Sequence, residues 1–386
     1  MNFRTFSILY FIFFFLGIAI LFAFLFLLSC FFEHNNYSQI VQYQIKNNAI
    51  YGSALNENYF QYRLELIKAQ KPDIVAIGSS RVGQFKQDFF NTSFVAAANG
   101  GNSMAETQYF VEQLLKIYHP KLIILGIDPW WFNAKMPNNK YASYQRMNGR
   151  DITTLKIFQG IKIIFSHPKQ FFEAISSGKT TTNPYTNLPS LGFRAFVKSD
   201  GSFIDGSYLY FSTLSGIFPA DDRKFQNSIY RISNEIFPFY YGNKIDPTRT
   251  KELISTVDLI RKYGIDVIVL TTPLAPSVYN MLIQDKDQRF SYLYSFSNFA
   301  IKNNIYNFFN PQTLTTTDCE FYDGFHGGDV VYARILSQIS KENSMLAHFV
   351  NLSKIQQIIN SKKGHAYSGD LTHWKETDFL ELGCKK

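Results

Sequence analysis

The chain has 386 residues, 46% of them hydrophobic, and a formal net charge of +8. This length and apolar content suffice for a large hydrophobic core, which excludes a mainly disordered chain. The Lys and Arg residues are scattered, without a long basic run or an aromatic-plus-basic RNA motif, so the charge does not indicate nucleic-acid binding. It better suits a position beside an anionic membrane or polymer.

An uncharged apolar stretch near the N-terminus, residues 6–32, predicts a membrane anchor. It is longer than the roughly 20 residues that cross a bilayer, and much longer than the roughly 7 to 15 residues of a signal-peptide core. Arg4 precedes the stretch and the next Lys after it is Lys46, so the positive-inside rule predicts a cytoplasmic N-terminus. We therefore expect a single-pass protein of the inner (cytoplasmic) membrane, held in the lipid bilayer by this helix, with a periplasmic or extracellular main domain.

Two cysteines lie beyond this anchor, Cys319 and Cys384. In an oxidising compartment they either form a disulfide, which would tie the tail to the segment before Asp323, or remain two free thiols, because spacing alone does not decide the geometry. No Cys-x-x-Cys or His-rich spacing indicates a structural metal. We expect neither a metal nor another cofactor.

The chain after the anchor alternates between strand and helix patterns. Residues 73–77 are an apolar run ending at Gly78, typical of a strand buried on both faces of a parallel sheet, and residues 93–98 predict a second, weaker strand. A capping box opens a helix at residues 103–119, and residues 121–127 form the third predicted strand.

The same unit recurs far downstream, with a helix predicted at 246–264 and a strand at 266–270. Alternating strands and helices predict an α/β fold, a three-layer sandwich around a mostly parallel sheet. The Tyr-, Phe-, Asn- and Ser-rich segment between the two parts shows no such unit and reads as an insertion. The predicted segments are a cytoplasmic N-terminus (1–5), the anchor (6–32), a stalk and leading helix (33–70), the first half of the α/β domain (71–134), the insertion (135–245), the second half (246–345) and a C-terminal tail (346–386).

Candidate reactive side chains lie where elements of the predicted sheet end. Ser79 and Ser80 follow the first strand, and Asp323 and His326 lie on a loop before a helix predicted at 329–340. Functional groups of an open α/β sheet gather at the carboxyl ends of its strands, so these side chains could meet there. A serine activated by a histidine that an aspartate orients is the chemistry of acyl transfer.

The residues around these side chains resemble a known superfamily. Gly78-Ser79-Ser80 is similar to the first block of the SGNH (GDSL-type) hydrolases, and Asp323-x-x-His326 to their last block. The segments at 99–102 and 126–129 fall at the places of the middle blocks. The similarity covers roughly residues 71 to 133 and 250 to 340 and implies an SGNH or flavodoxin-like sheet.

Within this superfamily, the anchored layout and the Gly-Ser-Ser-Arg variant look most like proteins that assist envelope acylation, such as those of alginate O-acetylation and teichoic-acid D-alanylation. The resemblance implies Ser80, rather than Ser79, as the nucleophile, with His326 as general base and Asp323 as its orienting partner. It also implies an oxyanion hole made by backbone amides of Ser80 and Gly101, with Asn102 beside them.

Asp128 departs from the resemblance. The superfamily usually has an Asn at this place, whose amide donates to the oxyanion, whereas an ionised carboxylate would repel the developing charge. Either Asp128 points elsewhere and Asn102 or Asn133 supplies the donor, or the oxyanion hole is weaker.

Other side chains near the same strand ends are candidates for substrate binding. Arg81 either binds an anionic group or is simply solvated. Trp130 and Trp131 form either a wall on which sugars stack or part of the buried packing. The candidate substrate-binding residues are Arg81, Asp128, Trp130, Trp131 and Asn133.

These patterns lead us to expect a membrane-anchored O-acyltransferase that modifies a cell-envelope polysaccharide, acetyl being the acyl group most common in the superfamily. A multi-span membrane acyltransferase would be the partner that donates the acyl group. One alternative is a carbohydrate esterase, or deacetylase, of the same fold. Another is a noncatalytic glycan-binding or partner scaffold, which Asp128 favours. A phosphodiesterase or nuclease is disfavoured because the sequence has no cluster of metal ligands.

Overall fold

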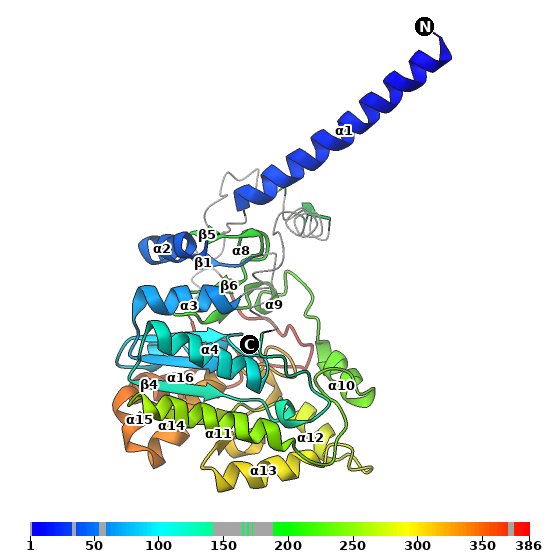
Figure 1. Cartoon of the computed structure of the whole chain (residues 1–386). Helices are drawn as coiled ribbons and strands as arrows, with labels where there is room; N and C mark the ends of the chain where they lie inside the picture. Colours follow the sequence, from blue (N-terminus) through cyan, green and yellow to red (C-terminus); the bar gives the residue numbers. More distant parts are fainter. Residues whose placement is uncertain are drawn as a thin grey trace.

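The computed structural model describes residues 2–32, 36–53, 59–141, 188–369 and 374–386, with a few further residues between 164 and 172. The first element is a long helix, α1 (Phe3–Phe32), which leads away from the rest of the molecule (Figure 1). Its segment Phe3–Leu25 has a mean hydropathy of 2.9 and is long and apolar enough to cross a membrane. A helix suited to the predicted anchor is therefore present, whereas its orientation across a membrane stays a prediction.

A parallel sheet forms the centre of the chain that follows. Its strands are β2 (Ile74–Gly78), β3 (Phe94–Ala98), β4 (Leu122–Gly126), β8 (Asp266–Thr271) and β9 (Tyr306–Asn307), in the order β3-β2-β4-β8-β9. Each neighbouring pair is parallel. Counted along the chain within this sheet, the order is 2-1-3-4-5, so the direction of winding reverses between β2 and β4. The predicted α/β class with a mostly parallel sheet is confirmed; β9 is an addition to it.

Helices cover both faces of this sheet, because β2, β3 and β4 are apolar and buried at every position. In β2, Ile74 and Ala76 join one hydrophobic core, while Val75 and Ile77 point to the opposite face and join the other. The first core includes residues of α12 (Pro276–Ile283), α13 (Tyr292–Lys302) and α14 (Asp329–Glu342). The second includes residues of α3 (Tyr59–Gln70), α4 (Met104–Ile117) and α11 (Pro247–Lys262).

A second, smaller sheet joins the segment after α1 to the insertion. Its strands are β1 (Ile50–Tyr51), β5 (Ser190–Leu191), β6 (Gly201–Ser202) and β7 (Tyr208–Leu209), in the order β5-β1-β6-β7. Helix α2 (Tyr37–Asn47) precedes β1, and its Gln44 side chain donates to the Ser202 carbonyl over 3.1 Å. Residues 33–70, expected to be a stalk with a leading helix, are thus folded against the insertion in their described part (Figure 1).

The described part of the insertion consists of short elements beside the sheet. They are α8 (Phe193–Lys198), α9 (Phe211–Leu214), the 3-10 helix η4 (Arg223–Phe225) and α10 (Gln226–Ser233). Most of residues 142–187 lie outside the described residues. Such short elements have little periodic pattern, which is why no repeating unit could be predicted here.

The C-terminal tail is folded back onto the second half of the domain. It begins with α15 (Ser344–Phe349) and α16 (Leu352–Ser361). Cys384 forms a disulfide with Cys319, over a Cα–Cα distance of 5.7 Å, so the paired alternative is the one the structure adopts. The Lys386 ammonium donates to the Cys319 carbonyl over 2.8 Å beside this bridge. Cys384 and Lys386 are therefore held beside Cys319, which lies shortly before Asp323 in the chain.

Candidate active site

Ser80 lies at the carboxyl end of β2, where the winding of the sheet reverses. Strand ends come very close here: a Cβ on Gly78 would lie 2.4 Å from the Gly126 carbonyl oxygen, so only glycine fits. The chain then turns directly into the 3-10 helix η1 (Ser80–Gln84), with Ser79 as its cap. Ser80 thus starts the helix, while the Ser79 hydroxyl accepts a bond from the Arg81 amide over 3.4 Å.

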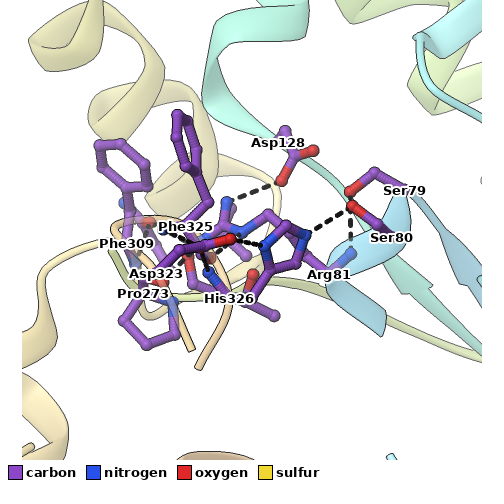
Figure 2. A network of polar contacts seen from close by, with 12 residues as sticks. Ser79, Ser80, Arg81, Asp128, Pro273, Phe309, Asp323, Phe325 and His326 are labelled. Carbon is purple, nitrogen blue, oxygen red and sulfur yellow. Dashed lines mark hydrogen bonds and ion pairs between the residues drawn. The ribbon is translucent and has the colours of Figure 1, made fainter. Parts of the chain in front are cut away.

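The structure brings Ser80, His326 and Asp323 together in a linear relay (Figure 2). Ser80 Oγ lies 2.7 Å from His326 Nε2, and His326 Nδ1 lies 2.7 Å from Asp323 Oδ2. Both distances are short enough for hydrogen bonds. All three residues are partly exposed, so a reactant can reach the serine and the imidazole.

Asp323 is suited to hold the imidazole in one orientation. Its Oδ1 accepts the backbone amides of Phe325 and His326, each over 2.7 Å, which leaves Oδ2 for the imidazole. Burial favours the neutral carboxyl, but the charge and hydrogen bond of His326 outweigh it, so the pKa of Asp323 lies below its usual value. The ionised carboxylate favours a proton on Nδ1, which leaves Nε2 free to accept the Ser80 proton.

Arg81 connects the serine turn to the loop that carries the histidine. Its guanidinium donates to Asp128 Oδ1 over 2.7 Å and to the Phe325 carbonyl over 3.1 Å. It also donates to the carbonyls of Thr272 and Pro273, which follow β8, over 2.5 and 2.6 Å. Arg81 is only 2% exposed and its donors are bound by protein acceptors, so neither the solvated nor the anion-binding alternative describes it. It fixes the strand ends and the histidine loop relative to one another.

Asp128 forms a buried ion pair with Arg81, and both side chains are almost fully covered. Its carboxylate is therefore directed at the guanidinium rather than toward Ser80, as Figure 2 shows. The expected repulsion of an oxyanion is thereby reduced, because the charge of Asp128 is compensated by a cation 2.7 Å away. Of the alternatives that the sequence left open for Asp128, the structure has the one in which it points elsewhere.

The other expected oxyanion donors differ in availability. The Gly101 amide already donates to the Gly78 carbonyl over 3.3 Å, and the Asn102 amide donates to the Glu106 carboxylate over 2.8 Å. The Asn133 side chain donates to the Tyr240 carbonyl over 2.7 Å and is buried. The Asn102 side chain, in contrast, is exposed and lines the cavity beside Ser80. The Asn102 side chain is thus the better placed of these candidates.

The tryptophans that follow β4 are mainly part of the packing. Trp130 and Trp131 lie in the 3-10 helix η3 (Pro129–Phe132) and are 5% and 1% exposed. The Trp130 ring lies 5.0 Å from the Arg81 guanidinium and contacts the edge of the Phe325 ring at 6.1 Å. Although both border the cavity, nearly all their surface is covered, as in the packing alternative.

Asp222, in the insertion, is a site residue that sequence reasoning missed. It is 5% exposed, and its Oδ2 accepts the Gly324 amide over 2.8 Å, directly after Asp323. The same oxygen accepts the Ser228 hydroxyl over 2.5 Å, and Oδ1 accepts the Ser228 amide over 2.9 Å. Asp222 therefore ties the insertion to the loop that carries the relay. Its acidic character was visible in the sequence, but its partner lies 102 residues away.

A cavity of about 430 Å³ opens at the relay. One side, the sheet-edge wall, comprises the cavity-lining residues of 79–131 and 322–326. The other lining residues, the inserted wall, are those between Arg194 and Pro238. Phe218 and Tyr210 bring apolar surface from the inserted wall, so the cavity is mixed in character, as binding sites usually are.

Asp200 is a carboxyl group of the inserted wall whose pKa is shifted in the opposite direction to that of Asp323. It is 5% exposed and accepts the amide and hydroxyl of Ser212 over 2.7 and 2.6 Å. Burial raises the pKa of Asp200 above its usual value, although these bonds and the charges of Arg194 and Lys198 act in the opposite direction. The inserted wall therefore offers a less acidic carboxyl than Asp323.

Among the described residues, no group of three or more His, Cys, Asp or Glu side chains is arranged to hold a metal ion. The relay and the cavity can nevertheless support chemistry that uses side chains alone, with Ser80 as nucleophile and His326 as base. No model of a known protein family matches the sequence, and no curated protein matches it.

Proposed function

We propose that this chain is a membrane-anchored, extracytoplasmic O-acyltransferase of the SGNH type that modifies a cell-envelope polysaccharide. The observation that carries the proposal is the Ser80–His326–Asp323 relay, with both hydrogen bonds at 2.7 Å, beside an open cavity. The apolar helix α1 supports the anchor. The SGNH assignment rests on the motif resemblance together with the 2-1-3-4-5 parallel sheet. The acyl group is acetyl in this proposal, because acetyl is most common in that superfamily.

In the first half-reaction Ser80 Oγ attacks the carbonyl carbon of the acyl donor. The Ser80 proton moves to His326 Nε2 as the new Oγ–C bond forms. The protonated imidazole is stabilised by Asp323, and it then gives the proton to the leaving group of the donor as the donor's acyl bond breaks. The result is an acyl ester on Ser80 and a released, protonated leaving group.

In the second half-reaction a sugar hydroxyl takes the place of the leaving group. His326 Nε2 accepts the hydroxyl proton while the sugar oxygen attacks the acyl carbon. The bond to Ser80 Oγ then breaks, and Oγ recovers the proton from the imidazole. The sugar leaves as an ester, and the relay returns to its starting state.

The charge on the carbonyl oxygen needs donors in both steps. Ser80 is the first residue of η1, and the first amides of a helix have no acceptor within it. We assign the Ser80 amide and the Asn102 side chain to this role, with each donor contributing about 3 kcal/mol to the transition state. Gly101 could contribute only by giving up its bond to the Gly78 carbonyl.

Hydrolysis would use the same acyl-enzyme with water in place of the sugar, so an esterase is the alternative of the same class. The inserted wall brings the Tyr210 ring beside the relay, with its centre 5.9 Å from that of the His326 ring, and this aromatic surface is the feature that supports transfer over hydrolysis. A multi-span membrane acyltransferase would supply the acyl group from the cytoplasmic side. A noncatalytic scaffold is less favoured than an enzyme, because Asp128, the residue that would support a scaffold, is paired with Arg81.

A fluorophosphonate that reacts with activated serines tests the relay. The detergent-solubilised full-length protein should be labelled, while Ser80→Ala should lose the label and Ser79→Ala should keep most of it. His326→Gln should slow labelling by about a thousandfold or more, as for other serine–histidine relays. Labelling that persists in Ser80→Ala, or a folded wild-type protein without label, contradicts the proposal.

Mass analysis of envelope glycans separates transfer from hydrolysis. A strain carrying Ser80→Ala should contain polysaccharide with fewer acyl esters than its parent if the protein is a transferase. More esters would identify an esterase. Unchanged esters in Ser80→Ala, combined with altered glycans when α1 is deleted, would identify a scaffold.

A further inference from the structure

We propose that α10 and the loop after it form the acceptor subsite, and that Arg231 binds an anionic group of the acceptor sugar. This inference rests on the proposed acyltransferase function. Asn227 and Arg231 lie one helical turn apart on α10, so both face the cavity that they line. Phe237, which also lines the cavity, is 50% exposed. An exposed aromatic face beside an amide and a guanidinium offers both stacking and hydrogen bonds to a sugar.

The position of Arg231 relates it to the reacting atoms. Its guanidinium carbon lies 5.8 Å from the centre of the Phe325 ring, and that ring centre lies 6.5 Å from the centre of the His326 ring. Arg231 and the imidazole therefore both neighbour the Phe325 ring. A sugar whose hydroxyl reaches His326 could place a substituent of the same or the next sugar at the guanidinium.

Arg231 has no compensating anion in the described part of the chain, where no carboxylate lies within ion-pair distance of it. This distinguishes it from Arg81, which also lines the cavity but is paired with Asp128 at 2.7 Å. Arg231 is half-buried, so its charge is only partly hydrated. A planar guanidinium in that state matches a carboxylate or phosphate group in two parallel hydrogen bonds.

The carboxylates of the cavity oppose an anion only in part, because Asp128 is paired with Arg81 and the oxygens of three others are bound by protein donors. Their donors are Arg81 for Asp128, the Ser228 and Gly324 amides for Asp222, Ser212 for Asp200 and His326 for Asp323. Asp221 is the exposed one at the cavity, where it would weaken an anion. The other cations of the inserted wall have contacts within that wall, whereas Arg231 contacts the histidine loop: Arg194 donates to the Tyr208 hydroxyl over 3.4 Å, and Lys198 lies 5.2 Å from the Phe218 ring centre.

Binding to the full-length Ser80→Ala protein tests the subsite without any acyl transfer. The probes are a uronic acid oligosaccharide, the same oligosaccharide with its carboxyl groups reduced, and a neutral oligosaccharide carrying a terminal phosphate. We expect at least one anionic probe to bind more tightly than the reduced one, and added Arg231→Gln to weaken that probe by about 10- to 100-fold. Arg231→Lys should recover part of the loss, and Asp221→Asn should tighten the same probe by about twofold to fivefold.

Arg223→Gln is the matched control, because it removes the same charge at an exposed residue that is bound to Glu381 over 3.1 Å. It should leave the preference for the anionic probe unchanged. The stronger anionic probe identifies the group as carboxylate or phosphate. Equal binding of all three probes, or a preference that Arg231→Gln retains, overturns the inference. Neither result depends on Ser80, so failure of the acyltransferase proposal is recognised separately by the absence of serine labelling.

Discussion

Asp323 and Asp200 line the same cavity, one in the sheet-edge wall and the other in the inserted wall, and their pKa values are shifted in opposite directions. The pKa of Asp323 is lowered because His326 and two backbone amides outweigh its burial. The pKa of Asp200 is raised because its burial outweighs the Ser212 bonds and the nearby cations. Both side chains are carboxylates in one cavity, so the difference comes from the wall that holds them. In the sheet-edge wall, the partners of Asp323 stabilise its ionised form more than burial destabilises it. In the inserted wall, the partners of Asp200 do not fully offset the effect of burial.

The sheet-edge wall is also the more rigidly connected of the two. Arg81, which follows β2, joins the ends of β4 and β8 to the histidine loop through side-chain and backbone acceptors, and the Ala275 amide adds a bond to the Gly324 carbonyl over 3.1 Å. The inserted wall is joined to that loop by one hydrogen bond among the described residues, from the Gly324 amide to Asp222, and otherwise by ring contacts such as that of Tyr210 with Tyr322 at 4.9 Å. A fixed wall for chemistry and a less constrained wall for the acceptor would suit an enzyme that must position Ser80 and still admit a polymer.

Replacing Arg81 should have the largest effect, because it removes the main connection of the sheet-edge wall. Arg81→Met leaves Asp128 as an uncompensated buried charge, so we expect the free energy of unfolding to fall by about 3 to 5 kcal/mol. The rate at which a fluorophosphonate labels Ser80 in the remaining folded protein should fall as well. Urea unfolding and labelling of the detergent-solubilised full-length protein measure the two effects.

Arg249→Met is the matched control. Arg249 is also buried and donates to the backbone carbonyls of Trp131 and Met136, each over 2.6 Å, but it does not contact the histidine loop. It should lose stability and keep the labelling rate of the folded fraction. If Arg81→Met and Arg249→Met slow labelling equally, the connecting role of Arg81 is wrong.

The disulfide should have the next largest effect on stability. Cys319→Ser with Cys384→Ser opens a loop that spans 65 residues, and such a loop usually contributes about 2 to 4 kcal/mol. Because Cys319 precedes Asp323 closely, the labelling rate should also become more sensitive to temperature. Thermal unfolding with and without reductant measures the loss, and Cys30→Ser in α1 serves as the control for removing a thiol. A wild type that reductant does not destabilise would contradict the expectation.

Asp222→Asn tests the hydrogen bond that joins the inserted wall to the loop carrying the relay. An asparagine keeps the shape but has one carbonyl acceptor for the Ser228 and Gly324 donors, so the loop should be held less firmly. We expect labelling of Ser80 to slow by about tenfold, the equivalent of one weakened charge-assisted hydrogen bond. A shift in the pH profile of labelling would show that the geometry of His326 has changed, which a loss of stability alone would not produce.

Asp205→Asn is the control for Asp222→Asn. The Asp205 carboxylate also accepts a backbone amide, that of Gln87 over 2.8 Å, and a serine hydroxyl, that of Ser207 over 2.6 Å, but away from the histidine loop. Its labelling rate should stay close to that of the wild type. Equal slowing in both variants would mean that Asp222 has no particular connection to the relay.

The sequence predicted the central elements of the fold because their signals are local. The apolar runs of β2, β4 and β8 and the capping box of α4 each lie within a short window. The two-residue strands of the small sheet and β9 have no such signal, because two residues establish no period. Their pairing depends on partners that are far away in the chain.

In the candidate site too, residues with a local sequence signal could be predicted, whereas contacts that depend on distant partners could not. Ser80, Asp323 and His326 could be selected because motifs at strand ends mark them, and their catalytic roles stay predictions. The ion pair between Arg81 and Asp128 could not be predicted, because it depends on the spacing of neighbouring strand ends in the folded sheet. Asp222 and Arg231 lie in a segment without periodic pattern, and their partners belong to the second half of the domain.

The smallest expected effect is on the pH dependence of stability, and it separates the two walls directly. A lowered pKa means that Asp323 stabilises the fold above its unfolded pKa of about 4 and loses this contribution as the pH falls through its folded pKa. A raised pKa gives Asp200 the opposite sign: its contribution is present below about pH 4 and is lost as the pH rises through its folded pKa. In Asp323→Asn, we expect the free energy of unfolding to fall less steeply with decreasing pH than in the wild type. In Asp200→Asn, we expect it to fall more steeply. Urea unfolding of both variants and the wild type between about pH 3 and pH 6 measures the slopes. If both variants change the pH dependence of the free energy of unfolding in the same direction, the pKa values of Asp323 and Asp200 are not shifted in opposite directions.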